Sequence, residues 1–139
     1  MTELSEMVNV RYMVDDVDEA MAFYTKFLAF KVLTSFPPAF ADVARGNLRL
    51  LLSVPGGTGG GGAALSDGSI PEPGGWNRFA IQVADIEGAI ADLRAKGAGF
   101  RGDIVSGVGV KQALLEDPDH NLVELYQPLA AYHERARPA

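Results

Sequence analysis

The chain has 139 residues, of which 47% are apolar and 22% charged, and its formal net charge is −6. This length is typical of one compact domain, and the acidic balance disfavours a nucleic-acid partner, which requires a basic surface. The absence of cysteine excludes disulfides and thiol nucleophiles and is compatible with a cytoplasmic location. No signal peptide and no apolar run of about 20 residues is found, so we expect no membrane partner.

The first part of the chain has the pattern of a β-α-β-β-β module over about residues 7–54. An alternating segment at 8–14 predicts a strand, and Asp16 after it is a suitable N-cap for a helix. Apolar residues recur at helical spacing over 17–28 and predict an amphipathic helix. Three more strands are expected near residues 30–35, 39–45 and 47–54.

Residues 55–75 connect this module to the next one and begin with the glycine-rich stretch Pro55–Gly62. A phosphate-binding loop would need a lysine after its spaced glycines, and no lysine occurs between Lys31 and Lys96. We therefore interpret the stretch as a flexible linker. A lid over a ligand site is the alternative, because long loops are often functional.

A second module with the same order is predicted over about residues 76–128. It starts with a strand at 76–84, followed by Asp85 as N-cap and a helix that Gly97 ends. Its further strands are expected near residues 98–105, 110–116 and 121–127. The tail at 129–139 is expected to form a short helix or to fray, and to contact a dimer partner.

The two modules are an internal repeat. Asp16 aligns with Asp85 at an offset of 69 residues, and Asn47 aligns with Asn121 at an offset of 74. One such unit is too small to bury both faces of its sheet. Two units side by side would form a larger curved sheet, and ligands prefer concave surfaces of this kind.

Three segments resemble the vicinal oxygen chelate superfamily, which includes glyoxalases, bleomycin-resistance proteins and extradiol dioxygenases. These segments are VNVRYMVDDVDEAMAFYTKFLAF, GGWNRFAIQVADIEGAIADLRAKG and LLEDPDHNLVELYQP. The resemblance covers about residues 7–128 and implies an α+β fold within a single domain over 1–139. Its two tandem βαβββ modules would form a curved, cup-shaped mixed sheet with the helices outside. It also implies a homodimer, but it does not fix the reaction.

The resemblance also locates four metal-ligand positions, which fall on Asn9, Leu50, Arg78 and Glu124. Only Glu124 matches the residue type that the metal enzymes of the family use. Leu50 cannot coordinate an ion, and Arg78 carries a permanent positive charge that repels one. We therefore expect no cofactor, with a divalent metal bound through Glu124 and unconventional ligands as the alternative.

The same layout brings Arg78 and Glu124 together and predicts an ion pair in place of the metal. The pair would hold an anionic or carbonyl-bearing ligand, with Arg78 as the electrophilic donor and Glu124 as the orienting group or base. In the other interpretation, the pair only neutralises two partly buried charges. The chain's histidines, His120 and His133, lie in a turn and in the tail, so no Ser-His-Asp arrangement is expected.

Further ligand-binding candidates surround this pair. They are Asn9, Leu50, Trp76, Gln112 and Tyr126. Alternation places Tyr126 on the same strand face as Glu124, although simple packing explains Tyr126 equally well. Trp76 is expected at a pocket rim or a dimer interface rather than in the core.

The leading functional hypothesis is a cytoplasmic homodimer that binds a small organic molecule without the usual metal. Binding would serve sequestration or a metal-free lyase or isomerase step. One alternative is a metal-dependent glyoxalase-like lyase or dioxygenase. The other is a non-catalytic structural or interaction module whose cup its own side chains fill.

Overall fold

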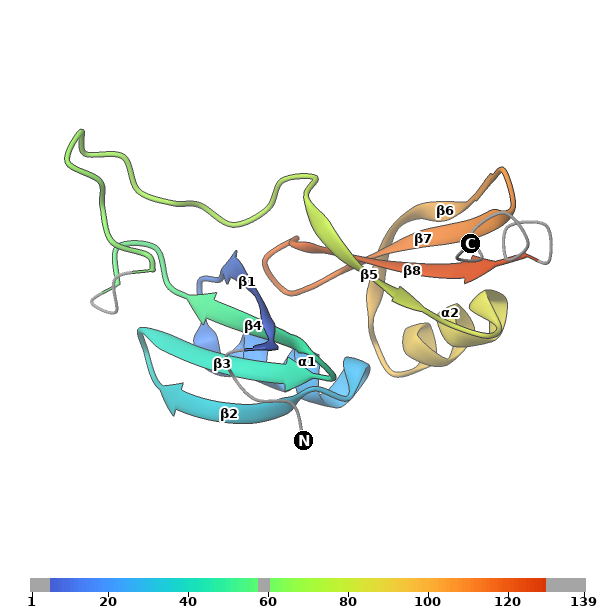
Figure 1. Cartoon of the computed structure of the whole chain (residues 1–139), viewed down its shortest axis with the longest axis horizontal. Coiled ribbons are helices and arrows are strands. Elements are labelled where there is room, and N and C mark those ends of the chain that lie inside the picture. The colour runs from blue at the N-terminus through green and yellow to red at the C-terminus, as the bar shows by residue number, and fades with distance from the viewer. Residues whose placement is uncertain (1–5, 58–60, 130–139) are drawn as a thin grey trace. The chain divides into compact units, whose positions relative to one another are not determined.

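The computed structural model describes residues 6–57 and 61–129, which form two compact units. The first unit comprises Met1–Gly75 with the turn Pro118–Asn121, and the second comprises Trp76–Asp117 with Leu122–Ala139. Each unit contains one helix and one four-stranded mixed sheet (Figure 1). In the described part of the chain, neither helix is long and apolar enough to cross a membrane.

The first unit has the strand order β1-β4-β3-β2. Strands β1 and β4 are parallel, and the other neighbouring strands are antiparallel. Its elements are β1 (Val8–Met13), α1 (Val17–Leu28), β2 (Lys31–Phe36), β3 (Phe40–Arg45) and β4 (Leu48–Ser53). The order of these elements along the chain, β-α-β-β-β, is the one that the alternating and helical patterns predict.

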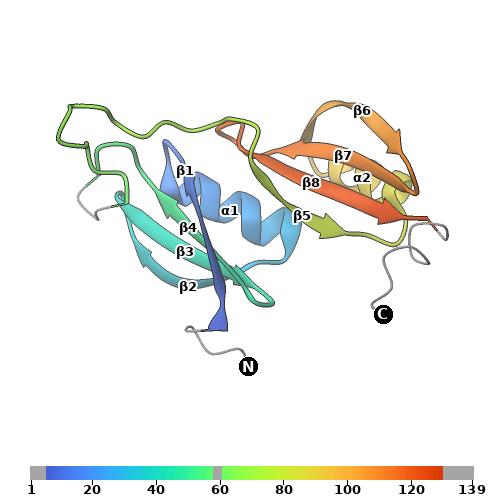
Figure 2. The same cartoon turned by 45° about the horizontal axis from the view of Figure 1, so that its top comes forward.

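Helix α1 covers one face of the first sheet (Figures 1 and 2). The Asp16 side chain accepts a hydrogen bond from the Glu19 amide at 3.0 Å and so caps the start of the helix. Val17, Ala20 and Tyr24 are buried on its inner side. Val43 and Leu50 of the sheet are completely buried as well, so the core of this unit lies between α1 and β3–β4.

The second unit repeats this arrangement with the strand order β5-β8-β7-β6. Its elements are β5 (Arg78–Gln82), α2 (Ile86–Ala95), β6 (Gly99–Gly107), β7 (Val110–Glu116) and β8 (Leu122–Pro128). Ile86, Ile90 and Leu93 of α2 are buried, as are Leu115 and Leu125 of the sheet. The core of the second unit therefore lies between α2 and β7–β8.

Two glycines of the predicted linker are held in close contact rather than being free. A Cβ on Gly61 would lie 1.9 Å from a terminal nitrogen of Arg11, and one on Gly62 would lie 1.9 Å from the Val54 carbonyl oxygen. Close approach of the backbone therefore requires glycine at position 62, whereas at position 61 the flexible Arg11 side chain could move away. Residues 58–60 of the predicted linker and residues 130–139 of the predicted tail lie outside the described part.

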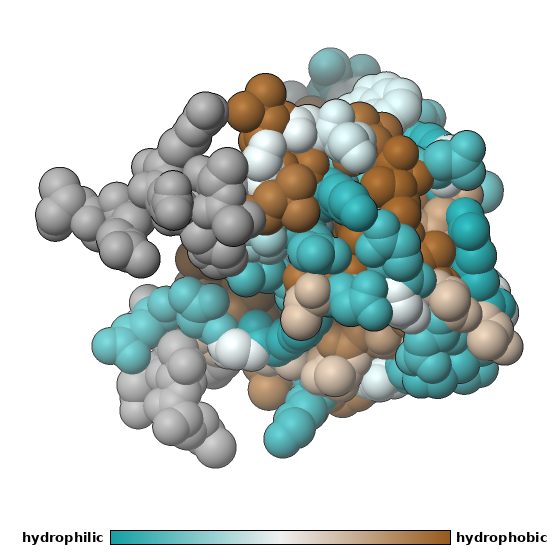
Figure 3. Space-filling model, turned by 90° about the vertical axis from the view of Figure 1, so that its right-hand side faces the viewer, coloured by the Kyte–Doolittle hydropathy of each residue, from teal (hydrophilic) through white to brown (hydrophobic). Residues whose placement is uncertain are grey.

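Apolar side chains also reach the surface of the second unit, where Figure 3 shows them as brown areas between hydrophilic neighbours. Val105 and Val108, near the β6–β7 connection, are 58% and 80% exposed. This end of the sheet is therefore not part of the core.

The predicted α+β fold with two tandem βαβββ modules is confirmed. The cup that the two sheets would form together stays a prediction. The strand predicted over 76–84 is shorter, because it starts at Arg78 and ends at Gln82. Gly74 and Gly75 before it have φ values of 95° and 99°, so a bend rather than a strand carries Trp76.

Candidate functional site

The face of the second sheet that points away from α2 carries most of the predicted site residues. Neighbouring Cα partners in the strands lie on the same face of a sheet, so the register places them in rows. Ala80, Glu124 and Leu114 form one row, and Gln82, Tyr126 and Gln112 form the next. We call the five residues Arg78, Gln82, Gln112, Glu124 and Tyr126 the polar face.

The predicted ion pair is present on the polar face. Nη2 of Arg78 lies 2.9 Å from Oε1 of Glu124, and Nε of Arg78 donates to the same oxygen at 3.0 Å. Nη1 of Arg78 donates to the backbone carbonyl of Trp76 at 3.2 Å. The side chains of Arg78 and Glu124 are 28% and 17% exposed. The guanidinium is therefore fixed from two sides and still accessible to a ligand.

Trp76 lies beside this pair and is 66% exposed, so it does not belong to the core. The guanidinium of Arg101 stacks on its ring, with 5.0 Å between Cζ and the ring centroid. Arg101 also pairs with Glu116, and the distance from Nη2 to Oε2 is 3.3 Å. A cation–π contact and an ion pair thus orient the indole at the border of the polar face.

Gln82 and Arg101 also belong to this site, although neither was predicted from the sequence. Gln82 accepts a hydrogen bond from the Tyr126 hydroxyl, with 3.5 Å between the two oxygens. Its position four residues after Arg78 on the same strand is a signal that alternation could have provided. Arg101 comes from β6, and no spacing in the sequence indicates that it meets Trp76.

The first unit contains the two other predicted site residues, Asn9 and Leu50. Asn9 is exposed and pairs with Arg49 on the face of the first sheet that points away from α1. Leu50 pairs with Val10 and Val43 on the opposite face and has no exposed surface. The prediction that Leu50 contacts a ligand is therefore wrong, because this side chain belongs to the core under α1.

The strand register explains this error. Arg11 pairs with Leu51 in the first unit at the place where Ala80 pairs with Glu124 in the second. Leu51, rather than Leu50, is thus the counterpart of Glu124. The sequence alignment of Asn47 with Asn121 places Leu50 opposite Glu124, one residue away from the true counterpart Leu51. A shift of one residue along a strand moves the side chain to the other face of the sheet.

The residues at the family's metal-ligand positions do not fit a divalent ion. With Leu51 in place of Leu50, the four positions hold Asn9, Leu51, Arg78 and Glu124. Glu124 is the only carboxylate among them, and it forms an ion pair with Arg78. A permanent cation within hydrogen-bonding distance of that carboxylate repels a metal ion. Over residues 6–57 and 61–129, no three His, Asp or Glu side chains are grouped so that they could hold one.

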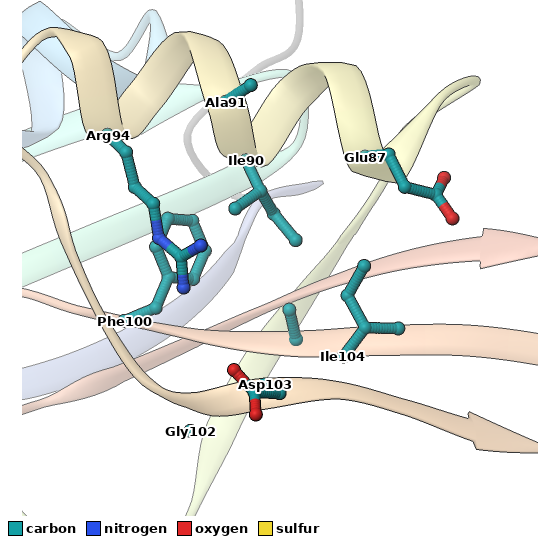
Figure 4. Close-up of a pocket in the computed structure, with 9 residues that line it drawn as sticks. Glu87, Ile90, Ala91, Arg94, Phe100, Gly102, Asp103 and Ile104 are labelled. Carbon is teal, nitrogen blue, oxygen red and sulfur yellow. The ribbon is translucent and has the colours of Figure 1, made fainter.

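A separate pocket of about 390 Å³ lies on the helix side of the second sheet, between α2 and β6 (Figure 4). There, Cζ of Arg94 lies 5.3 Å from the centroid of the Phe100 ring, and Ile90 and Ile104 supply apolar surface. The register of β6 is irregular between Arg101 and Val105, next to this pocket. None of the predicted site residues lines it.

Comparisons with known proteins agree with this architecture. Residues 7–125 match the family model described as Glyoxalase/Bleomycin resistance protein/Dioxygenase superfamily. No protein of curated function matches the chain.

Several solved structures have a similar fold. Lactoylglutathione lyase from Agrobacterium tumefaciens is 21% identical with a TM-score of 0.67, and the match covers 88% of this chain and 93% of that one. TnmS3, an antibiotic binding protein from Streptomyces sp. CB03234, is 23% identical with a TM-score of 0.62 and coverages of 88% and 94%. A superfamily member from Sphaerobacter thermophilus DSM 20745 is 22% identical with a TM-score of 0.68 and coverages of 87% and 95%. The family match spans most of the sequence, and the chain therefore belongs to the glyoxalase/bleomycin resistance protein/dioxygenase superfamily.

Proposed function

We propose that this protein binds a small organic molecule on the polar face of its second unit, through a carboxylate or carbonyl oxygen and without a metal ion. Arg78 is the group that would recognise this oxygen. Glu124 holds the guanidinium in place and supplies the negative charge that balances it. The ion pair between Arg78 and Glu124 is the observation that carries this proposal.

The hydrogen bonds of Arg78 support this assignment. Nε and Nη2 both contact a single oxygen of Glu124, and Nη1 contacts the Trp76 carbonyl. A guanidinium has five N–H donors, so these contacts leave donors for a ligand. A fully enclosed pair would have no access for a ligand, but the Arg78 side chain remains 28% exposed.

The neighbouring side chains fit an organic molecule with a flat apolar part. Trp76 and Tyr126 offer aromatic surface, and Gln82 and Gln112 offer amide donors and acceptors. Small-molecule sites usually combine apolar surface with a few polar groups that fix the orientation of the ligand. Sequestration of such a molecule needs no further group, and it is the role that we propose first.

A metal-free lyase or isomerase step is the second candidate. The hydrogen bond from Arg78 ends on Oε1 of Glu124, and in the part of the chain that the structure describes Oε2 accepts no hydrogen bond. This oxygen is available to accept a proton from a ligand carbon next to a carbonyl that Arg78 polarises. The similar structures include a protein named as a lyase and one named as antibiotic binding, so fold alone does not separate the two roles.

A binding screen with matched compounds tests the proposal. Aromatic acids such as benzoate and phenylpyruvate, each beside its neutral amide, are titrated into the full chain by calorimetry. We expect the acids to bind and Arg78→Ala to weaken their binding about tenfold or more, since it removes a charge-assisted contact. Arg94→Ala, an arginine on the helix side of the sheet, is the matched control and should leave binding unchanged.

Two results would overturn the proposal. Equal affinity of wild type and Arg78→Ala for a bound acid would remove Arg78 from the site. Failure of acids, amides and larger drug-like compounds alike would favour a structural or interaction module. The homodimer and the cytoplasmic location stay predictions, and light scattering of the purified chain measures the former.

A further inference from the structure

We propose a second ligand site, on the helix side of the second unit, that binds a small organic zwitterion with a short apolar body. The site is the pocket of about 390 Å³ between α2 and β6, which lies wholly within this unit (Figure 4). This volume is within the range of about 300–1,000 Å³ that is usual for small-molecule sites. The polar face lies on the other side of the sheet, so the proposal does not depend on the function proposed for Arg78.

A bulge in β6 forms one wall of the pocket. The register gives β6 three residues, Gly102, Asp103 and Ile104, where β7 has only Ala113. Gly102 has a φ of 73°, a backbone conformation that favours glycine. Bulges of this kind bend a strand and redirect its side chains. All three residues of the bulge line the pocket, so the irregular register provides its strand wall.

Helix α2 supplies the opposite wall. Glu87, Ile90 and Arg94 are three and four residues apart, so they project from one side of the helix. Figure 4 shows Ile90 facing Ile104 across the pocket. Ala113 of the sheet also lines the pocket and is only 3% exposed. An apolar ligand body can therefore lie between the two isoleucines, where it would cover apolar surface.

Arg94 is the positive group of the pocket. Its Cζ lies 5.3 Å from the centroid of the Phe100 ring, and this cation–π contact holds the guanidinium at the pocket. Within the described part of the chain, Arg94 forms no ion pair and donates no side-chain hydrogen bond. Stacking on a ring leaves the N–H groups at the edge of a guanidinium available. Arg94 can therefore bind a carboxylate.

Two carboxylates line the pocket as well, and only one of them is paired. Oε1 of Glu87 accepts from Nζ of Lys111 at 2.7 Å, so a cation of the protein balances this charge. Asp103 is exposed and, over residues 6–57 and 61–129, has no ion pair and no side-chain hydrogen bond. The pocket thus offers one unpaired charge of each sign, Arg94 on the helix wall and Asp103 on the strand wall. This arrangement favours a zwitterion over an ion of a single charge.

Three compounds of similar length test the charge requirement. 6-Aminohexanoate has an acid and an amine at the ends of an apolar chain, and hexanoate and hexylamine each have one of these groups. In NMR titrations of the full chain, we expect 6-aminohexanoate to shift the amide signals of Ala91 and Ile104. We also expect it to bind about fivefold or more tightly than either single-charge compound. Absence of these shifts, or equal affinity of the three compounds, would overturn the proposal.

Matched double variants test the residues. Arg94→Gln combined with Asp103→Asn should weaken 6-aminohexanoate binding about fivefold or more. Asp92→Asn combined with Lys96→Gln also removes one acid and one base, near the end of α2 but outside the pocket, and should leave the affinity unchanged. Equal binding of 6-aminohexanoate by the two double variants would refute the site.

One further variant separates this site from the polar face. Arg78→Ala should leave the signal changes at Ala91 and Ile104 intact. Signal changes that disappear in Arg78→Ala would assign 6-aminohexanoate to the polar face and overturn the present proposal. An aromatic acid without an amine meets only one of the two unpaired charges of the pocket, so Arg94→Ala stays a control for acid binding at the polar face.

Discussion

Both units have arginine–carboxylate pairs on the face of the sheet that points away from the helix, and Arg49–Asp42 of the first unit differs in burial from Arg78–Glu124 of the second. In the first unit, Arg49 pairs with Asp42, whose side chain is 1% exposed. In the second unit, Arg78 pairs with Glu124, whose side chain is 17% exposed. Asp42 has Thr34 as a second donor residue, but the hydrogen bond that Glu124 accepts from Arg78 engages only Oε1.

The difference shows how the same chemistry serves two purposes. A buried carboxylate needs several hydrogen bonds to offset its lost hydration, and Asp42 has them. Removing one partner from such a pair is costly, because the remaining charge stays buried. A partly exposed pair contributes less to folding and keeps hydrogen-bonding capacity for a ligand. Arg49 and Asp42 therefore stabilise the first unit, whereas Arg78 and Glu124 form the candidate recognition site.

The largest expected effect is the loss of stability when Leu50 of β4 is truncated. Leu50 lies between Arg49 and Leu51 in sequence but on the opposite face, where it is completely buried. Leu50→Ala should lower the free energy of unfolding by roughly 3 to 5 kcal/mol in urea titrations, through lost burial and a cavity. Leu48→Ala, at the less buried start of the same strand, should cost clearly less. Equal costs at the two positions would contradict the complete burial of Leu50 under α1.

The next effect concerns the buried pair itself. Arg49→Gln leaves the Asp42 carboxylate without its charged partner but keeps the Thr34 bonds. We expect a loss of about 2 to 3 kcal/mol in the free energy of unfolding, measured by urea titration. A variant as stable as wild type would show that Asp42 does not depend on Arg49.

The matched variant in the second unit, Arg78→Gln, should affect ligand affinity more than stability. Arg78→Gln should change the free energy of unfolding by less than about 1 kcal/mol, because the pair is partly exposed. The same variant should weaken binding of a carboxylate ligand about tenfold, measured by calorimetry. A large loss of stability with unchanged ligand affinity would reverse the roles that we assign to the two pairs.

The smallest effect is a pH dependence at the surface of the second unit. A hydrogen bond from Lys111, with 2.7 Å between Nζ and Oε1, lowers the pKa of Glu87. A lowered pKa stabilises the fold above the ordinary pKa of the carboxyl group, and this contribution is lost as the pH falls through the lowered value. Lys111→Gln should raise the pKa of Glu87 in an NMR titration. An unchanged titration would mean that the contact is absent in solution.

The fold could be predicted largely from the sequence because both modules have clear periodicity. The helical spacing from Val17 to Leu28 and the caps at Asp16 and Asp85 are local signals, and the structure has both helices at these places. The register is not a local signal. It depends on connection lengths that differ between the modules, and so Leu50 was predicted at the place of Leu51.

The candidate site was predictable in part. Arg78 and Glu124 lie on neighbouring parallel strands, and the resemblance to a family indicated that those strands meet. Arg101 meets Trp76 only because β6 folds back beside β7 and a bend carries the indole toward it. Contacts of this kind depend on tertiary packing, which alternation along single strands cannot provide.

In the proposed function, Arg78 supplies the positive charge at Glu124 that an ion would otherwise supply. Calorimetric titration of Zn²⁺, Ni²⁺ and Mn²⁺ into wild type and Glu124→Gln tests this most directly. We predict no metal binding that depends on Glu124. Stoichiometric binding of one ion per chain that disappears in Glu124→Gln would contradict the assignment of Arg78 as the partner that replaces the ion.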